Sequence, residues 1–424
     1  MGLWREHSRG QLDARLAEAR TAYDRLRAEG LSLDMTRGKP NAQQLDLSDE
    51  LLALPGRGVY RSASGRDCRN YGLIDGLPEA RALFAPMLDA TPEQIMLGGN
   101  ASLAVMHDAV WRAMTFGVPG GKGPWSLGPV KFICPVPGYD RHFNLLAHFG
   151  IEMIPVPLGD DGPDMDRVRA LAASDSLIKG IFCVPKYSNP TGVVYSDAVV
   201  DGLASMAAAP DFRIFWDNAY SVHCLGESPH PLKSLLAACE AAGHPNRPLC
   251  FGSTSKISFA GGGISFMASS LENLADARSH ICLQTIGPDK INALRHVMFF
   301  GDYAGILAHM AKHAAILRPK FDAIQAVFSA EFDDTGILEW TRPQGGYFVS
   351  LQTLPGCAKR VVALAKDVGV KLTEAGATFP HGFDPEDSNI RLAPSLPPLE
   401  EIETALAAIA ICVKVASLEQ LTAS

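Results

Sequence analysis

The sequence lacks the marks of several large protein classes. Its 424 residues contain no basic block, and the formal net charge is −8, so an extended nucleic-acid interface is not expected. No apolar run is long enough to span a bilayer, and the charged start MGLWREHSRGQLDARL has no apolar signal segment. No tandem repeat is visible either. These absences predict a globular cytoplasmic protein without nucleic-acid or membrane partners.

Cysteine spacing excludes two further kinds of site. The nine cysteines are scattered, and none forms a Cys-x-x-Cys pair, so neither a structural zinc site nor a redox motif is expected. Several cysteines lie in apolar runs such as KFICPV and GIFCVP, which is typical of reduced cysteines in a protein core. We therefore predict no metal site.

The pattern of apolar runs predicts an α/β fold. From about residue 90, short apolar runs alternate with helical patterns, as in QIMLGG, VKFICPV, IKGIFCVP, FRIFWDNAY and PLCFGSTSK. Such runs indicate parallel strands that are buried on both faces, and the alternation predicts a mostly parallel, doubly wound sheet flanked by helices. After about residue 300 the pattern changes to a long helix at 303–328, short strands, and helices near 357–369 and 398–417. We expect a large domain at 50–302 and a smaller α+β domain from 1–49 and 303–424, with an N-terminal arm that begins as a helix at 10–29.

Polar residues follow the predicted parallel strands. In a doubly wound sheet the ligand binds beyond the carboxyl ends of the strands, so these residues are expected to share one site. The strand ends are Gly98-Gly99-Asn100, Pro137-Gly138-Tyr139, Ser188-Asn189-Pro190, Asp217 to Tyr220 and Ser253 to Lys256.

Two of these side chains suggest a specific chemistry. Lys256 lies in FGSTSKISFAGGGISF, with no carboxylate within ten residues on either side. A lysine in apolar surroundings has a depressed pKa and can form a Schiff base, although a lysine at a sheet edge is the plainer interpretation. Asp217 ends an apolar strand, where a buried carboxylate needs a partner or caps a helix. A lysine with an aspartate is the pair that pyridoxal phosphate requires.

Weaker signals accompany this pair. Asn189 in YSNPTG and Tyr220 can donate to the phenolate oxygen of that cofactor, although the turn at Asn189 is also an ordinary connection. The stretch LGGNASLAV places Ser102 at a helix start, where free N–H groups can bind a phosphate or where Ser102 simply caps the helix. Ser253 and Ser255 offer further hydroxyl groups.

Taken together, these motifs resemble a known family. SNPTG, DNAY, STSK and IRLAPS occur in the order and at the spacing of class I/II pyridoxal-phosphate-dependent aminotransferases of fold type I. YGLIDGLPEARALF resembles the segment of that family that reaches a neighbouring subunit's cofactor. The resemblance extends from Met35 to the last helix, and MTRGKPNAQQLDLSDELL is most similar to a bacterial aspartate aminotransferase subgroup.

The resemblance implies a homodimer that transfers an amino group between aspartate and 2-oxoglutarate in a ping-pong reaction. It implies roles for individual residues of this sequence. Lys256 would carry pyridoxal phosphate and move the substrate proton, Asp217 would hold the ring nitrogen, and Asn189 with Tyr220 the phenolate oxygen. Tyr139 would stack on the ring, Asn100, Ala101, Ser102, Ser253 and Ser255 would hold the phosphate, and Tyr71 would reach it from the other subunit. Arg391 and the Gly38 N–H would bind the substrate α-carboxylate, with Asn189 beside them.

The sequence departs from the family at one position and leaves several alternatives. Ile264 stands where the family places a phosphate-binding arginine, eight residues after the lysine. For the second carboxylate of aspartate we rank Arg37 first, ahead of Arg141 and Lys186. An aminotransferase for aromatic or other amino acids, or a β-lyase, would use the same Lys256 and Asp217. The cofactor-binding domain of a transcriptional regulator is not expected, because the region before Met35 is short and has no excess of basic residues.

Overall fold

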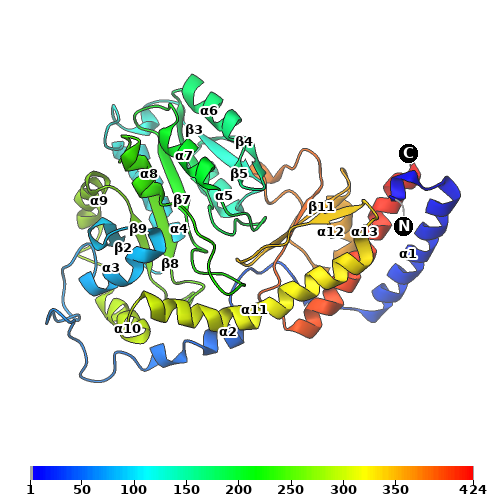
Figure 1. Ribbon diagram of the computed structural model, residues 1–424, viewed down its shortest axis with the longest axis horizontal. Coiled ribbons are helices and arrows are strands. Elements are labelled where there is room, and N and C mark those ends of the chain that lie inside the picture. Colours follow the sequence, from blue (N-terminus) through cyan, green and yellow to red (C-terminus); the bar gives the residue numbers. More distant parts are fainter. Residues whose placement is uncertain (1–2, 424) are drawn as a thin grey trace.

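An eight-stranded sheet forms the centre of the larger part of the molecule (Figure 1). The strand order is β2-β9-β8-β7-β6-β3-β4-β5, and the pairs from β4 through β3, β6 and β7 to β8 are parallel. The outer pairs β2-β9, β8-β9 and β4-β5 are antiparallel. This arrangement confirms the mostly parallel α/β sheet predicted from the sequence. The bounds are β2 Ile95–Leu97, β3 Lys131–Val136, β4 Glu152–Gly159, β5 Gly162–Pro163, β6 Ile178–Cys183, β7 Arg213–Asp217, β8 Pro248–Ser253 and β9 Ser265–Ala268.

The apolar strands are buried on both faces because helices cover both sides of the sheet. Successive side chains of a strand point to opposite faces, so Ile214 and Trp216 join one buried cluster and Phe215 joins another. The first cluster includes residues of α3 Pro78–Phe84, α6 Met165–Ser174, α7 Asp197–Ser205, α8 Leu235–Ala241 and α10 Lys290–Phe300. The second includes residues of α4 Ser102–Phe116, α5 Asp140–His148 and α9 Leu271–Gln284. The sheet is therefore doubly wound.

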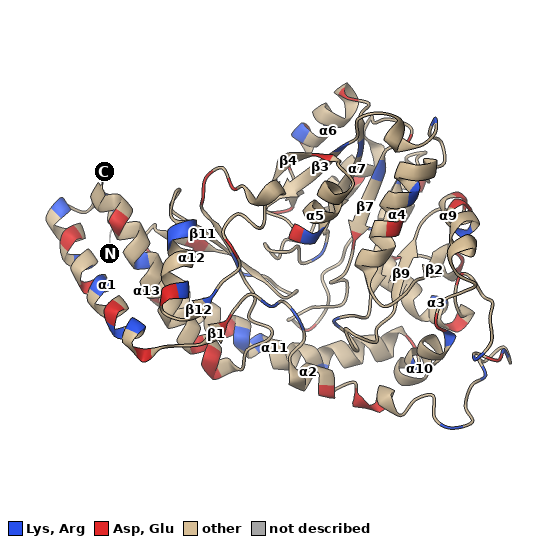
Figure 2. Ribbon diagram, turned by 180° about the vertical axis from the view of Figure 1, so that it is seen from behind, with Lys and Arg blue, Asp and Glu red and all other residues tan. Residues whose placement is uncertain are grey.

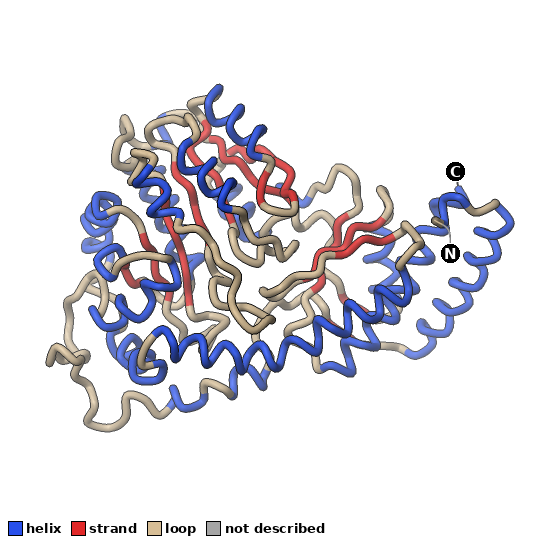
Figure 3. Tube along the Cα trace, viewed as in Figure 1, coloured by secondary structure: helices blue, strands red, loops and turns tan. Residues whose placement is uncertain are grey.

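A smaller part contains the antiparallel sheet β10-β11-β13 and the two-stranded parallel sheet β1-β12. Its own buried cluster lies between these strands and the surrounding helices (Figure 3). The bounds are β1 Leu33–Asp34, β10 Leu338–Trp340, β11 Val349–Thr353, β12 Val370–Lys371, β13 Asn389–Leu392, α1 Arg9–Glu29, α11 Tyr303–Phe332, α12 Ala358–Asp367 and α13 Leu399–Ala423.

Helix α1 forms where the sequence predicts it. Ser8 Oγ accepts a hydrogen bond from the backbone N–H of Gln11, and the backbone N–H of Ser8 donates to Gln11 Oε1, which caps the first turn. Gly30 ends the helix in the left-handed region at φ 64°, a conformation that glycine adopts without a Cβ clash. Leu12 and Tyr23 are buried in the cluster of the smaller part, so this arm packs beside α13 (Figure 1).

The long helix α11 connects the two parts (Figure 1). Ile306 and Met310 near its start belong to a buried cluster of the larger part, whereas Leu317 and Phe321 belong to that of the smaller part. The domain division at 50–302 and at 1–49 with 303–424 stays a prediction, and α11 crosses its boundary because Ile306 and Met310 pack with the larger part.

The structure is a computed structural model, which describes residues 3–423. Within this range no helix has both the length and the apolar character that crossing a membrane requires. Lysine and arginine alternate with acidic residues along outer helices such as α1, in keeping with a surface of mixed charge (Figure 2). The remaining short elements are α2 Ala42–Asp46, η1 Trp4–Glu6, η2 Asp49–Leu52, η3 Ala85–Leu88, η4 Pro92–Gln94, η5 Trp125–Leu127 and η6 Pro380–Gly382.

Candidate active site

The carboxyl ends of β3, β6, β7 and β8 bring together most of the predicted site residues. Tyr139 follows β3 and begins α5, Asn189 follows β6, Asp217 ends β7, and Lys256 follows β8. Asn189 and Asp217 are buried, and Tyr139 and Lys256 are partly exposed. Because β3, β6, β7 and β8 are neighbours in one parallel sheet, these residues face the same edge. Across this edge lie β11 and β13 of the smaller part.

Asp217 is held by a histidine that the sequence analysis missed. Its Oδ2 lies 2.9 Å from Nε2 of His142, and both side chains are almost fully buried. The His142 ring stacks on Phe182, with centroids 4.3 Å apart, which fixes its orientation. The other carboxylate oxygen, Oδ1, is buried and has no hydrogen-bond partner among residues 3–423. A buried acceptor of this kind fits a cationic N–H donor, such as a protonated ring nitrogen.

The amine of Lys256 lies close to Tyr220. Its Nζ is 5.1 Å from the centroid of the Tyr220 ring. Burial lowers the pKa of Lys256, and the charge of Asp217 partly opposes this shift. Burial also raises the pKa of Tyr220, so its hydroxyl stays protonated and can donate. The site therefore combines an amine that loses its proton more easily, a hydroxyl donor and a carboxylate.

A buried polar network supports the backbone of Lys256 from behind. The Lys256 carbonyl accepts from Tyr347 Oη at 3.4 Å and from His223 Nε2 at 3.3 Å. Gln44 of α2 donates to Tyr347 Oη at 2.9 Å and lies 3.0 Å from Nδ1 of His313. His313 in turn contacts His309, which lies 2.9 Å from the carbonyl of Ile257. The network thus begins and ends on the segment that carries the lysine.

The histidines of this network are uncharged at neutral pH. Burial lowers the pKa of His223 to about 3 and that of His313 to about 3. Burial lowers the pKa of His296, which bonds Ser258 beside Lys256, to about 4. The sequence analysis did not select these residues, although His309 and His313 stand four apart, a spacing that places two side chains on one helix face.

Arg391 of β13 reaches from the smaller part to the sheet edge. Its Nη1 pairs with Asp140 Oδ1 at 2.7 Å and lies 3.4 Å from Asn189 Oδ1. The guanidinium carbon lies 5.1 Å from the centroid of the Phe348 ring. Gly38 packs against the same ring so closely that a Cβ would overlap it, so glycine is required there. Gly38 and Arg391 are thereby brought together, as the sequence analysis expected.

The predicted phosphate-binding residues also converge. Helix α4 begins at Ser102, and its N-cap residue Ala101 makes no side-chain cap, so the first backbone N–H groups remain available. Ser255 Oγ donates to the carbonyl of Asn100 at 3.1 Å, which places β8 beside the helix start. Ser253 is buried next to it at the end of β8.

Ile264 cannot serve a phosphate through its side chain. It is 4 % exposed, belongs to the apolar core, and donates its backbone N–H to Thr254 Oγ1 at 2.9 Å. A cavity of about 250 Å³ lies beside it, and Arg295 of α10 lines this cavity together with Asn100 and the glycines at 261–263. Nothing in the local sequence links Arg295 to the site, so it could not be predicted.

Four predicted residues lie outside this convergence. The Tyr71 side chain is 81 % exposed. Arg37 is exposed and its Nε lies 3.9 Å from Asp34 Oδ2, a distance typical of a weak surface pair. Arg141 is exposed beside Tyr139. Lys186 is buried, which lowers its pKa, while the charge of Asp89 acts in the opposite direction.

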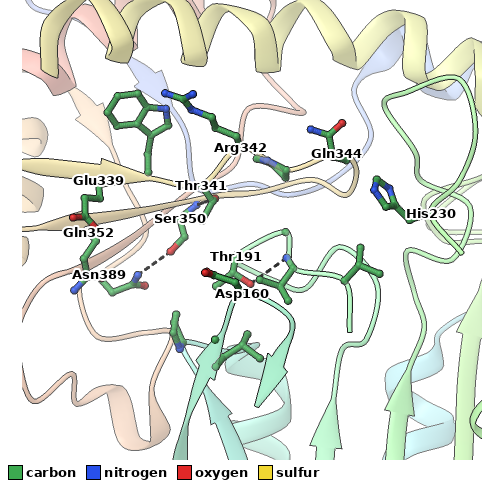
Figure 4. A pocket seen from close by; sticks show the side chains of 18 residues that line it. Asp160, Thr191, His230, Glu339, Thr341, Arg342, Gln344, Ser350, Gln352 and Asn389 are labelled. Atoms are coloured by element: carbon green, nitrogen blue, oxygen red, sulfur yellow. Dashed lines mark hydrogen bonds between the residues drawn. The ribbon is translucent and has the colours of Figure 1, made fainter. Parts of the chain in front are cut away.

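A cavity of about 730 Å³ opens between the two parts (Figure 4). Thr191, two residues after Asn189, lines one side. Ser350 and Asn389 line the other, and Asn389 Nδ2 donates to Ser350 Oγ at 2.8 Å. Ser350 pairs with Arg391 across the strands and Asn389 precedes Arg391 by two, so the cavity adjoins Arg391. It is wide enough to admit a small polar metabolite from solvent.

These features define an α/β enzyme with its site at the carboxyl edge of a parallel sheet, closed by a second part of the chain. The sequence model of the family described as aspartate amino-transferase matches residues 8–424. The chain belongs to this family and is an aminotransferase, which acts on amino acids and 2-oxo acids.

Individual relatives agree with this assignment. An aspartate aminotransferase of Corynebacterium glutamicum is 47 % identical over 399 residues, covering 94 % of this chain and 92 % of that protein. The crystal structure of an aspartate transaminase from the same organism superposes with a TM-score of 0.97 at 45 % identity, covering 99 % of both chains. An α-aminoadipate aminotransferase of Thermus thermophilus, complexed with N-(5'-phosphopyridoxyl)-L-leucine, has a TM-score of 0.73 at 19 % identity over 95 % of both chains and shares the fold.

Proposed function

We propose that this aminotransferase uses pyridoxal phosphate on Lys256 and transfers the amino group of aspartate to 2-oxoglutarate. The observation that supports the cofactor most is the unpartnered, buried Oδ1 of Asp217 at the same sheet edge as Lys256. Use of this cofactor is also supported by the phosphopyridoxyl ligand of the Thermus relative. The names of the Corynebacterium relatives support aspartate as the amino donor.

Each residue of the site has a task that its position allows. The cofactor, when bound, supplies an electron sink for the carbanion formed at the substrate Cα. Lys256 would provide the amine to which the cofactor attaches, and its lowered pKa would let the amine take and return the Cα proton. Asp217, oriented by His142, would hold the ring nitrogen in its protonated form. Tyr220 and Asn189 would donate to the phenolate oxygen, and Tyr139 would pack on the ring.

The phosphate would be held mainly by neutral donors. We assign this task to the backbone N–H groups and side chains at Asn100, Ala101 and Ser102, with the hydroxyls of Ser253 and Ser255. The helix start and the adjacent serine contact support this assignment. Arg295, which lines the neighbouring cavity, is the competing candidate, and a cofactor complex with its guanidinium on the phosphate would contradict the neutral-donor assignment.

The substrate carboxylates would be bound by arginine. Arg391 and the Gly38 N–H take the α-carboxylate, and the contact between Gly38 and the Phe348 ring beside Arg391 supports this pairing. For the second carboxylate we propose Arg37, because it adjoins Gly38 and its weak surface pair leaves it free to turn. Arg141 is the second candidate, since it follows Tyr139 by two residues.

A screen of half-reactions tests the proposed substrate. Purified enzyme loaded with pyridoxal phosphate is mixed with one amino acid at a time, and conversion of the cofactor to pyridoxamine phosphate is followed by its absorption. We expect aspartate and glutamate to convert it much faster than alanine or phenylalanine, because an apolar amino acid leaves the arginine for the second carboxylate unpaired. Faster conversion by phenylalanine would refute the dicarboxylate preference.

Variants of the two candidate arginines locate the second carboxylate. We expect Arg37→Ala to lower kcat/KM for aspartate by about two orders of magnitude, the loss typical of a charge-assisted hydrogen bond, with little effect on the slow alanine reaction. Arg141→Ala serves as the matched variant. An equal loss for both amino acids would show that Arg37 acts on the fold or the cofactor instead.

We further propose that the active unit is a homodimer with shared sites. Tyr71, Leu283 and Ile286 are at least 60 % exposed. Their segments lie side by side, because Lys290 Nζ donates to the carbonyl of Gly72 at 3.0 Å. Exposed apolar residues gathered in this way favour an interface between copies of the chain. In this arrangement Tyr71 would reach the phosphate of the partner's site.

Mixed dimers test the shared site. Lys256→Ala and Tyr71→Ala chains are each expected to have little activity, whereas dimers reassembled from both should regain up to about a quarter to a half of wild-type activity, because one site per mixed dimer then has both residues. Separately tagged chains allow the mixed dimer to be purified. A purified mixed dimer without recovered activity would show that Tyr71 does not serve the other chain's site.

A further inference from the structure

Asp140 forms an ion pair with Arg391, the arginine to which we assign the substrate α-carboxylate. Asp140 Oδ1 lies 2.7 Å from Arg391 Nη1, and the two side chains are 27 % and 9 % exposed. Asp140 begins α5 of the larger part, and Arg391 lies on β13 of the smaller part. The pair therefore joins the two parts across the site.

The remaining contacts of Arg391 leave it dependent on this partner. Nη1 lies 3.4 Å from Asn189 Oδ1, a neutral acceptor at the limit of hydrogen-bond distance. Nε is buried without a partner among the described residues, and the guanidinium lies over the apolar ring of Phe348. A buried guanidinium without a counter-charge is costly, and Asp140 supplies that charge.

The surroundings of Asp140 can stabilise its carboxylate when the carboxylate is not paired with Arg391. It is the first residue of α5, where the helix N-terminus favours a negative charge. The preceding residue, Tyr139, makes no side-chain cap there, and Arg141 follows it in the sequence. The side chain of Asp140 is partly exposed, so water reaches its carboxylate. Release from Arg391 therefore leaves the carboxylate solvated and near favourable charge, so the exchange is reversible.

We propose that Asp140 is an internal competitor for the substrate α-carboxylate, pairing with Arg391 in the empty enzyme and leaving it when substrate binds. This rests on the proposed role of Arg391. All substrates and products of a transamination carry an α-carboxylate, so Asp140 lowers the affinity for each of them and speeds the release of products. Asp140 thus affects the affinity for the α-carboxylate indirectly, through its ion pair with Arg391.

Asp140→Asn tests the competition, because it removes the charge and keeps the shape. The half-reaction is followed by stopped flow with the best amino acid of the wild type, which yields Kd and the limiting rate separately. We expect Kd for both the amino acid and the 2-oxo acid to fall about tenfold, in the range of one charge-assisted hydrogen bond, with far less change in the limiting rate. Asp140→Glu restores a carboxylate and should return Kd toward the wild-type value.

A matched control tests whether the change in Kd comes from Asp140 itself or from removing any acidic residue at the start of a helix. Asp166 lies in the first turn of α6 and pairs at 3.4 Å with Arg169 on the surface, so Asp166→Asn should leave Kd unchanged. Binding of succinate to the loaded enzyme, measured by calorimetry, gives a readout without turnover and should tighten in Asp140→Asn. Asp140→Ser supplies the same readouts if the asparagine variant does not fold.

The outcomes distinguish this inference from the proposed function. An unchanged or higher Kd in folded Asp140→Asn overturns the competition and shows that Asp140 only anchors Arg391. If Arg391→Lys also leaves Kd unchanged, the assignment of Arg391 to the α-carboxylate fails, and this inference fails with it. A preference for an amino acid other than aspartate would not affect the test, because every amino acid carries the same α-carboxylate.

Discussion

Lys256→Ala is expected to lower kcat by at least about 10⁴-fold, because the variant loses the amine that takes and returns the Cα proton, and proton transfer of this kind contributes about 10²- to 10⁴-fold by itself. The variant should still bind pyridoxal phosphate, since Asp217, Tyr220 and the phosphate-binding groups at α4 remain. Borohydride reduction of the loaded wild type, followed by peptide mapping, should place the pyridoxyl group on the peptide at 253–266.

Two controls sharpen this result. Lys312→Ala changes an exposed lysine and should retain both labelling and turnover. Small primary amines added to Lys256→Ala should restore part of the rate, because they can enter the space left by the side chain and accept the proton. A pyridoxyl label on another lysine, or full activity of Lys256→Ala, would refute the assignment.

Asp217→Asn has the second largest expected effect. The amide cannot stabilise a cationic ring nitrogen as a carboxylate does, so we expect kcat to fall by about 10²- to 10³-fold, the loss typical of one preorganised electrostatic group. The side chain keeps its size and can still contact His142, so the fold should persist. Equilibrium dialysis should show weaker binding of pyridoxal phosphate, and single-turnover kinetics should show a slower limiting rate.

His142 provides the comparison for Asp217. Within residues 3–423, its one side-chain hydrogen bond to the proposed cofactor-binding groups is the 2.9 Å contact with Asp217 Oδ2, so His142→Asn should have a clearly smaller effect on kcat than Asp217→Asn. Equal losses in the two variants would mean that the orientation of the carboxylate matters as much as its charge. Normal kcat in Asp217→Asn would show that the unpartnered oxygen does not face the ring nitrogen.

Much of the site could be predicted because its residues follow strands that the sequence marks clearly. The runs before Asp217 and Ser253 are continuous and apolar, and parallel strands must present their carboxyl ends at one edge. His142 was missed because its contact with Asp217 spans 75 positions, and a histidine among apolar residues is more often a core residue. The pair of Asp140 and Arg391 spans 251 positions and had no local signal.

The sequence by itself determined the class of fold, the order of its elements and the residues with the chemistry, because hydrophobic period, helix caps and motif spacing are local properties. It placed Lys256 and Asp217 at strand ends and the first helix at 10–29. The tertiary structure alone decided which groups meet in space. It left Asp217 Oδ1 buried without a hydrogen-bond partner among the described residues, packed histidines against the backbone that carries Lys256, and paired Asp140 with Arg391. Burial and charge depend on what surrounds a side chain in space, and those neighbours come from elements far apart in the chain.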